Sequence, residues 1–145
     1  MKRIAVAGVS RESKGHGANL VYRRMKERGY TVFAVNPRTD SVEGDRCYPD
    51  LRAIPGGVDG VVIATPPSAT TSVVQDCIDL SIRHVWIHQG PVPGSVTAEA
   101  VQLCQEKGID VIDGGCPLMF GATSDLGHRC IGWFLGLSGS LPRGI

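Results

Sequence analysis

The chain has 145 residues, of which 42% are hydrophobic and 20% are charged, and its formal net charge is +1. This length supports one ordinary globular core, so we expect a single domain over residues 1–145. A net charge near zero argues against nucleic acid held by bulk positive charge. Residues 1–38 nevertheless contain nine Lys and Arg against two acidic residues, a local charge of +7. This asymmetry predicts a local anion site, although charges on a solvated helix face would give the same count.

The cysteines and the apolar runs indicate where the protein works. The cysteine count is odd and no two cysteines form a C-x-x-C pair, which favours a reduced compartment; they are Cys47, Cys77, Cys104, Cys116 and Cys130. The apolar run after Lys2 and Arg3 ends at Val9, too early for a signal-peptide core, and no later run is long enough to span a membrane. We therefore expect a soluble, cytoplasmic protein with no membrane partner.

Short apolar runs alternate with helical patterns along the chain. The runs cover residues 4–7, 31–35, 60–64, 84–87 and 109–112, and most are β-branched and apolar at successive positions, as in strands buried on both sides of a parallel sheet. Helical spacing covers residues 18–28, a segment with Ser68 as its N-cap, and a segment from about residue 95 to 107. This order predicts an α/β fold: a Rossmann-like, doubly wound, mainly parallel five-stranded sheet with helices on both faces.

Two further segments carry weaker signals. Residues 36–57 are rich in turn formers but too long for a simple loop, so we expect a small strand at residues 46–48 and a helical turn after Pro49. Residues 125–137 have apolar side chains at helical spacing, interrupted by glycines. They predict a C-terminal helix that packs on the sheet or on a second subunit.

In an open parallel sheet, ligands bind beyond the carboxyl ends of the strands. The first strand is followed by Gly8-Val9-Ser10-Arg11 and, after Lys14, by a helix. Glycine lets the backbone approach a phosphate, exposed N–H groups attract it, and Arg11 or Lys14 could close over it. A purely structural role for the glycine is the alternative, because most strand-to-helix turns use one.

The second strand ends in Val35-Asn36-Pro37-Arg38. A nicotinamide dinucleotide site prefers G-x-G-x-x-G after the first strand and an acidic residue here, and this chain has neither. Arg38 would pair with a phosphate on a ribose, so the chemistry predicts NADP or coenzyme A, unless Arg38 is a plain surface charge. The other basic residues of the first quarter, Arg23, Arg24, Lys26 and Arg28, lie within the predicted helix and are expected to face solvent.

An ordered set of segments carries a family resemblance. Each follows a predicted strand: Gly8-Val9-Ser10, Val35-Asn36-Pro37, Thr65-Pro66-Pro67, Gln89-Gly90 and Cys116-Pro117. Up to about Phe120 the chain resembles the stand-alone coenzyme A-binding proteins, whose domain is similar to the nucleotide-binding domain of the succinyl-CoA synthetase α subunit. The resemblance implies a Rossmann-like domain with coenzyme A as its cofactor. The phosphohistidine domain of the synthetase has no counterpart in these residues.

The resemblance also implies roles for individual residues. Gly8, Val9, Ser10 and Arg11 would cradle the pyrophosphate, with Lys14 as a weaker candidate. The nucleotide end would meet Pro37 and Arg38, where the synthetase pattern has a lysine in place of the arginine. Thr65 and Pro66 would form a wall past the switch point. The pantetheine side would face Gln89 and Gly90.

Chemistry beyond binding has little support in the sequence. Cys116 follows the last strand, so its thiol could form a mixed disulfide with coenzyme A, although buried cysteines are usually packing residues. No histidine pair has metal-ligand spacing, and we expect no metal site. We therefore predict a protein that binds coenzyme A or acyl-CoA without catalysis of its own, with a second copy or an acyl-CoA enzyme as partner. The alternatives are a small NADP-binding oxidoreductase, a redox-sensing nucleotide-binding protein, and an interaction domain with a vestigial crevice.

Overall fold

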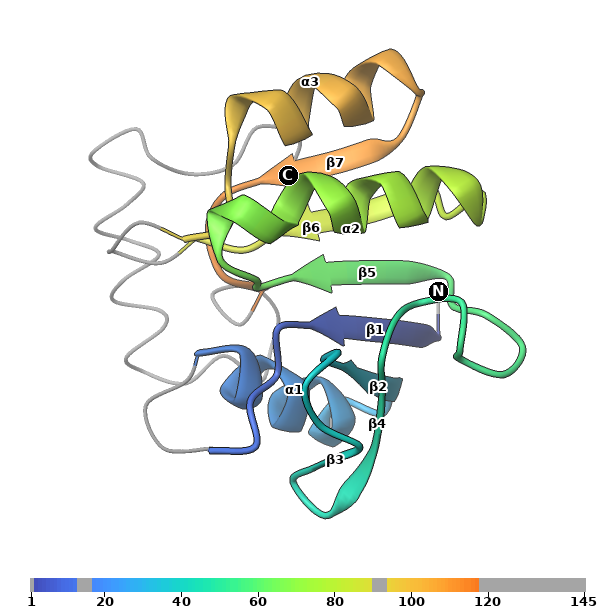
Figure 1. Ribbon diagram of the computed structural model, residues 1–145, viewed down its shortest axis with the longest axis vertical. Coiled ribbons are helices and arrows are strands. Elements are labelled where there is room, and N and C mark those ends of the chain that lie inside the picture. The colour runs from blue at the N-terminus through green and yellow to red at the C-terminus, as the bar shows by residue number, and fades with distance from the viewer. Residues whose placement is uncertain (1, 13–16, 90–93, 118–145) are drawn as a thin grey trace.

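The computed structural model describes residues 2–12, 17–89 and 94–117, and Figure 1 shows their arrangement. The elements in chain order are β1 (Arg3–Ala7), α1 (Gly17–Glu27), β2 (Thr31–Val35), β3 (Ser41–Val42), β4 (Asp45–Tyr48), β5 (Gly60–Ile63), α2 (Pro67–Asp79), β6 (His84–Ile87), α3 (Ala98–Glu106) and β7 (Asp110–Asp113). The five predicted long strands are present, each within one residue of its expected bounds. The predicted C-terminal helix at residues 125–137 lies outside the described residues.

The sheet has seven strands in the order β3-β4-β2-β1-β5-β6-β7, and every pair except β3–β4 is parallel. The expected count of five is therefore wrong by two strands. The anticipated strand at residues 46–48 is β4, and the two-residue strand β3 pairs with it as an antiparallel hairpin. Short edge strands of this kind hold few apolar residues, so they leave little periodic signal.

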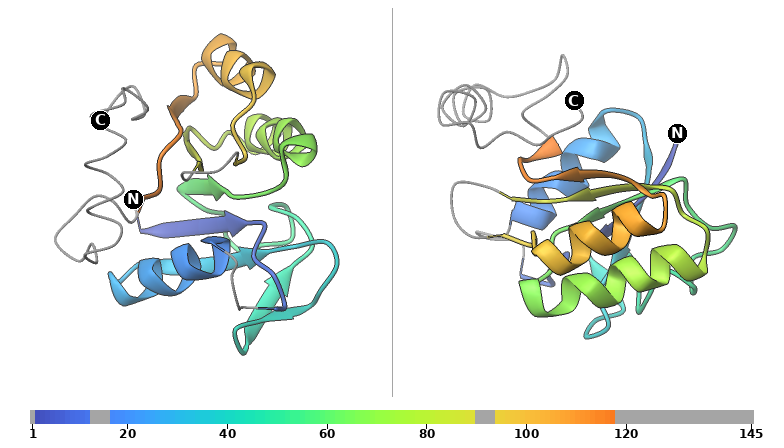
Figure 2. Two further views of the ribbon diagram at one scale, coloured as in Figure 1. Left: turned by 90° about the vertical axis from the view of Figure 1, so that its left-hand side faces the viewer. Right: turned by 90° about the horizontal axis from the view of Figure 1, so that it is seen from above.

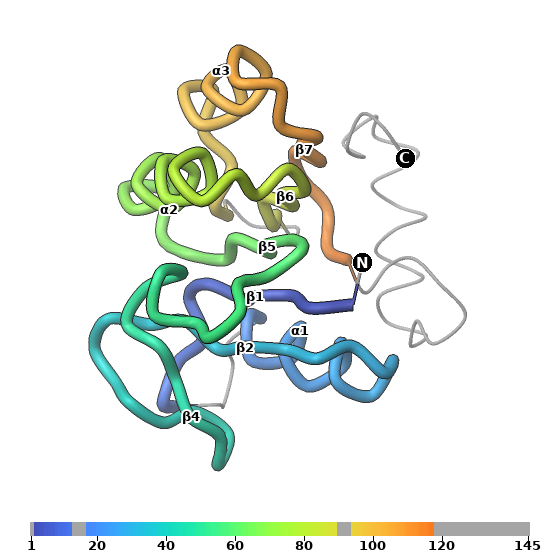
Figure 3. Tube along the Cα trace, turned by 90° about the vertical axis from the view of Figure 1, so that its right-hand side faces the viewer, coloured from blue at the N-terminus to red at the C-terminus, as the bar shows by residue number. Residues whose placement is uncertain are grey.

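Helices cover both faces of the sheet, as predicted. Helices α2 and α3 lie on one face and α1 on the other, which is clearest in the two turned views of Figure 2 and in the trace of Figure 3. Successive strand residues therefore enter opposite cores: Ala5 and Ala7 pack on the α2–α3 side, whereas Ile4 and Val6 pack on the α1 side. Two apolar cores on one parallel sheet explain why the strands read as continuous apolar runs.

The hairpin β3–β4 is joined to α1 by polar contacts. The Lys26 Nζ lies 2.5 Å from Asp45 Oδ2, and the Tyr22 hydroxyl donates to the same oxygen at 2.7 Å. The Arg23 Nη1 lies 2.9 Å from Glu43 Oε1. Arg23 and Lys26 are partly exposed to solvent, as expected, but each also forms an ion pair that the sequence did not predict. Acidic residues of the hairpin neutralise part of the basic first quarter.

Two helix starts differ from the predicted ones. Helix α2 begins at Pro67, with Pro66 rather than Ser68 at the N-cap and no side-chain cap, because proline has the φ angle of a first helical residue and no N–H to satisfy. Helix α3 begins at Ala98, where the Thr97 side chain accepts a hydrogen bond from the N–H of Ala100. No helix among the described residues has the length and hydropathy needed to cross a membrane.

Candidate functional site

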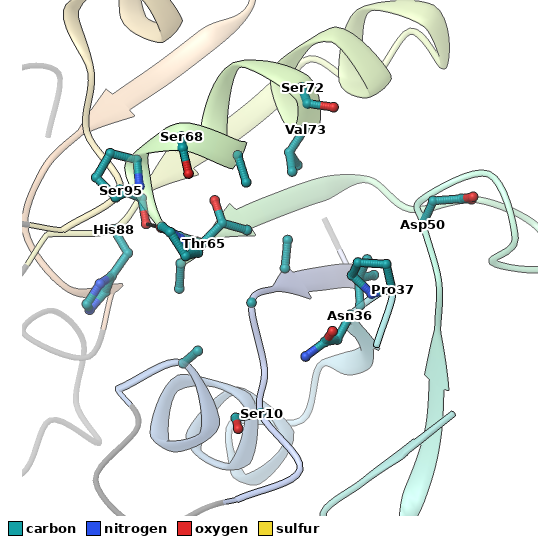
Figure 4. Close-up of a pocket in the computed structure, with 18 of the residues that line it drawn as sticks. Ser10, Asn36, Pro37, Asp50, Thr65, Ser68, Ser72, Val73, His88 and Ser95 are labelled. Atoms are coloured by element: carbon teal, nitrogen blue, oxygen red, sulfur yellow. Dashed lines mark hydrogen bonds between the residues drawn. The ribbon is translucent and has the colours of Figure 1, made fainter. Parts of the chain in front are cut away.

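A cleft of about 1020 Å³ lies beyond the carboxyl ends of β1, β2 and β5. The chain leaves β1 toward α1 on one face of the sheet and leaves the neighbouring β5 toward α2 on the other, so the cleft occupies the topological switch point. Figure 4 shows Ser68, Ser72 and Val73 of α2 on one side of it and Ser10, Asn36 and Pro37 on the other. The fold thus opens the cleft where an α/β domain of this kind binds ligands.

Most of the sequence-predicted site residues line this cleft: Gly8, Ser10, Pro37, Arg38, Thr65, Pro66 and Cys116. Val9 does not, because its side chain is fully buried in the core on the α1 side. Arg11 is exposed, and neither Arg11 nor Gln89 is among the lining residues. Lys14 and Gly90 lie outside the described residues. The ligand contacts expected of all these residues stay predictions.

Gly8 is required by the packing of the turn itself. Its φ is +98°, and a Cβ at this position would lie 2.3 Å from the carbonyl oxygen of Ala64 and 2.9 Å from the nitrogen of Thr65. Its N–H donates to the Val35 carbonyl at 3.0 Å. The backbone after β1 therefore passes directly against the end of β5. The close packing of this turn therefore explains the glycine without any ligand.

Asn19 of α1 holds the next part of the turn. Its Oδ1 accepts from the Ser10 N–H at 2.8 Å, and its Nδ2 donates to the Ser10 carbonyl at 2.8 Å. The N–H groups of Gly8 and Ser10, which were expected to face a phosphate, thus donate within the protein. Ser10 lines the cleft, and its Oγ also accepts from the N–H of Glu12 at 3.2 Å. The hydroxyl is the polar group that Ser10 can offer to a ligand.

Asn36 places the residues that follow β2. Its Nδ2 donates to the Val9 carbonyl at 2.8 Å, and its Oδ1 accepts from the Arg38 N–H at 2.8 Å, which is an Asx turn. The side chain therefore joins the turn after β1 to the backbone of Arg38. Sequence reasoning quoted Asn36 only as part of a motif, although asparagine directly after a strand and before proline is a signal for such a turn.

The turn between β5 and α2 forms the opposite wall. The buried Thr70 Oγ1 donates to the Ser95 carbonyl at 2.7 Å, and the Ser95 Oγ donates to the Thr65 carbonyl at 2.6 Å. These bonds tie the start of α2 to the segment that precedes α3. Ser95 was expected near the start of α3, but it serves instead as this tie.

One face of α2 lines the cleft through Ser68, Ser72 and Asp76. Their spacing of four residues puts them on one side of the helix, while Val74 and Cys77 are buried on the other. Sequence reasoning missed this polar stripe, although its periodicity was readable. The first residues of α2, Pro67 and Ser68, line the cleft, so the positive end of the helix dipole lies beside it, and no side chain caps this end.

The charges of the cleft are unevenly placed. Arg38 is the basic side chain among the described lining residues, and Asp50 and Asp76 are the acidic ones. Asp76 forms an ion pair with Arg52, and Asp50 Oδ1 accepts from the Ala53 N–H at 2.9 Å. In Figure 4 Asp50 lies far from Ser68 and His88. Pro37, which precedes Arg38, lies on the same side as Asp50 in Figure 4. The start of α2 is therefore the part of the cleft away from Asp50, and an anionic group there would meet the positive end of the helix rather than this carboxylate.

The remaining wall holds the groups with potential reactivity. His88 lines the cleft, and its Cε1 lies 3.7 Å from the Cβ position of Gly17 at the start of α1. Cys116 lines the cleft with 4% of its surface exposed. Burial raises the pKa of Cys77 to about 12 and that of Cys104 to about 11, and both lie in the core between the sheet and the helices α2 and α3. The described residues contain no group of three His, Cys, Asp or Glu that could hold a metal ion.

The parallel sheet, the helices on both faces and the cleft at the switch point define a Rossmann-like α/β domain. A family model described as CoA binding domain matches residues 2–122, and the chain belongs to this family. The motifs that follow the strands therefore identified the family correctly.

Relatives and solved structures agree with this assignment. The chain is 31% identical over 111 residues to the uncharacterized protein YneT of Bacillus subtilis, covering 77% of this chain and 78% of that protein. It is 27% identical over 156 residues to the acetate–CoA ligase (ADP-forming) II subunit alpha of Pyrococcus furiosus, covering 98% of this chain but 34% of the subunit. The structure of a hypothetical protein from Pyrococcus horikoshii superimposes with a TM-score of 0.72 and 30% identity, covering 79% and 78% of the two chains.

Proposed function

We propose that this protein binds coenzyme A or an acyl-CoA in the cleft, as a binding module without catalysis of its own. The observation that carries the proposal is the position of Arg38, which lies on the rim of a switch-point cleft in a chain of the CoA binding domain family. The ligase subunit that resembles this chain is named as a CoA ligase, and the chain spans 34% of it. We therefore assign the binding step alone.

The lining residues suggest how coenzyme A would be oriented in the cleft. Arg38 would pair with the ribose phosphate, since a guanidinium forms strong charge-assisted hydrogen bonds with phosphate oxygens. The pyrophosphate would lie between the Ser10 hydroxyl and the uncapped start of α2 beside Ser68. The pantetheine arm would then run toward His88 and Cys116.

The size of the cleft supports a large ligand. Clefts for drug-sized molecules have volumes of roughly 300–1,000 Å³, and this one has about 1020 Å³. A nucleotide with a long arm, such as coenzyme A, would use that space more fully than a mononucleotide.

NADP is the second candidate, and Arg38 is the observation that favours it. The side chain follows β2, where it could pair with a 2′-phosphate as well as with the 3′-phosphate of coenzyme A. The turn after β1 argues against a dinucleotide, because it reads G-x-S-x-x-S in place of G-x-G-x-x-G.

Calorimetry of the protein against coenzyme A, dephospho-CoA, NADP and NAD separates these candidates. We expect coenzyme A to bind most tightly, dephospho-CoA more weakly, and both nicotinamide nucleotides weakest of all. Binding of NADP without binding of coenzyme A would replace the proposed function by the second one. Binding of none of the four would leave a domain whose cleft has lost its ligand.

A further inference from the structure

Among the described residues, Asn19 and Thr70 are the polar residues with no exposed surface, and neither lines the cleft. Asn19 nevertheless makes three hydrogen bonds of 2.8 Å: two with the backbone of Ser10 and one from its Nδ2 to Glu43 Oε1. Both N–H donors of the amide and its oxygen are therefore hydrogen-bonded. A buried amide that is this well satisfied holds its partners in one arrangement.

The three bonds connect three segments that are distant in sequence. Asn19 belongs to α1, Ser10 to the turn after β1, and Glu43 to the turn of the β3–β4 hairpin. Glu43 has a φ of 54°, and its carboxylate also pairs with Arg23 at 2.9 Å. Glu43 Oε1 thus accepts from both Asn19 and Arg23, while the Asn19 amide also bonds to the Ser10 backbone.

We infer that Asn19 is a positioning residue of the cleft: it fixes the Ser10 peptide, and Glu43 orients Asn19 for this task. The inference rests on the proposed function insofar as the ligand is coenzyme A. Loss of the Asn19 amide would free Ser10, a lining residue, because this amide bonds to both its N–H and its carbonyl. With the amide in place, the Ser10 side chain is held in one orientation at the cleft.

The polarity of the amide makes a charge-exchange test possible. In Asn19→Asp one oxygen still accepts from the Ser10 N–H, but the other faces two acceptors, the Ser10 carbonyl and the Glu43 carboxylate. In Asn19→Asp with Glu43→Gln, the new Gln amide can donate to the new carboxylate, so the bond between α1 and the hairpin returns with reversed polarity. The net charge of the group equals that of the wild type. The repulsion at the Ser10 carbonyl remains.

A merely structural role and a positioning role therefore give different results. We measure unfolding by urea and coenzyme A binding by calorimetry for the wild type, both single variants and the double variant. We expect Asn19→Asp to lose stability and to bind coenzyme A about tenfold or more weakly, which is the scale of one lost hydrogen bond to a charged ligand group. Glu43→Gln alone keeps an oxygen that can accept from Asn19 but loses the charge that faces Arg23, so its coenzyme A affinity should lie between those of the wild type and Asn19→Asp. The double variant should regain stability without regaining affinity.

Gln102→Glu is the matched control. The Gln102 Nε2 donates to Glu106 Oε1 at 2.8 Å on the exposed face of α3, so this substitution also turns an amide that faces a carboxylate into a second carboxylate. It should leave coenzyme A binding unchanged. If the double variant of Asn19 and Glu43 recovers affinity together with stability, or if Asn19→Asp binds like the wild type, the positioning role is refuted.

Amide hydrogen exchange separates this inference from the proposed function. In Asn19→Ala the Ser10 N–H loses its acceptor, so we expect its exchange to become at least tenfold faster relative to that of Val62, which lies in the buried strand β5. An unchanged ratio would refute the inference whether or not the protein binds coenzyme A. A wild-type protein that binds no coenzyme A would instead refute the proposed function, and the Ser10 exchange ratio alone then decides whether Asn19 holds the turn.

Discussion

The two strand-to-helix turns that face each other across the cleft differ in how their polar groups are used. In the turn after β1, the N–H groups of Gly8 and Ser10 donate to Val35 and Asn19. In the turn after β5, α2 begins at Pro67 with no side-chain cap, and Ser68 lines the cleft. The glycine turn is thus largely occupied by the fold itself, whereas the proline turn presents an open helix end. A glycine after the first strand is therefore not by itself a sign of a phosphate cradle.

The largest effect should come from filling the space at Gly8. In Gly8→Ala the new methyl group would collide with the Ala64 carbonyl, and the backbone would be strained at a φ of +98°. We expect a loss of about 3 kcal/mol or more in the free energy of unfolding. Urea denaturation measures it. Gly44→Ala is the control, because Gly44 has a φ of +80° but no atom within 4 Å of its Cβ position. It should lose only about 1 kcal/mol, and equal losses would show that the contact with β5 does not matter.

The next prediction concerns Arg38, the charged side chain that would contact the ligand on the β1–β2 side of the cleft. Arg38→Ala should weaken coenzyme A binding by about 1.5–3 kcal/mol, the scale of a hydrogen bond to a charged group, and leave dephospho-CoA almost unchanged. Calorimetry with both ligands measures the difference. Arg83→Ala serves as control, because Arg83 is exposed next to the start of β6, at the opposite end of the sheet. Equal losses for both ligands in Arg38→Ala would contradict a contact with the ribose phosphate.

Ser68 tests the open helix end on the other side. Ser68→Asp places a carboxylate in the first turn of α2, which should stabilise the helix by about 0.3–1 kcal/mol. The same charge should repel the pyrophosphate and lower the affinity for coenzyme A about tenfold, on the scale of one unfavourable charge contact. Stability and affinity would thus move in opposite directions. Ala98→Asp, at the exposed start of α3, should give the stability gain alone. Undiminished affinity in Ser68→Asp would move the phosphate away from α2.

The smallest effect concerns the anchoring of the hairpin to α1. The hydrogen bonds from Lys26 and Tyr22 hold the pKa of Asp45 below its usual value of 3.8. A depressed carboxyl pKa stabilises the fold above the unfolded pKa, and this contribution disappears as the pH falls through the folded one. Because both charged side chains are nearly half exposed, Asp45→Asn should cost less than about 1 kcal/mol at pH 7. Urea denaturation from pH 7 to pH 2 should show the variant and the wild type converging below the ordinary carboxyl pKa. A constant difference would contradict this origin.

The sequence predicted the framework and the edge of the sheet where the cleft lies. Buried parallel strands leave β-branched runs, so strands such as Thr31–Val35 and His84–Ile87 could be located to the residue. The segments that follow β1, β2 and β5 then include Gly8, Arg38 and Thr65, all of which line the cleft. This success follows from topology, because parallel strands end on one side of the sheet.

The parts that could not be predicted depend on contacts between distant segments. Strand β3 has two residues and exists through its pairing with β4. The bonds of Asn19 join residues 10, 19 and 43, a combination with no periodic signal. Val9 was expected in the turn that would cradle the pyrophosphate; its side chain is buried in the core, so a contact there would have to come from its backbone. Position along the chain identifies the neighbourhood of a residue more surely than the direction of its side chain.

The pairing of α1 with the hairpin also bears on how fast an anionic ligand would arrive. Lys26 and Arg23 lie against Asp45 and Glu43, so most of the long-range attraction of these two cations is cancelled within a few ångströms. Encounter would then depend on diffusion into a preformed opening and on short-range capture by Arg38. An association rate governed this way changes little with ionic strength, whereas the dissociation rate carries the selectivity between phosphorylated and dephosphorylated ligands.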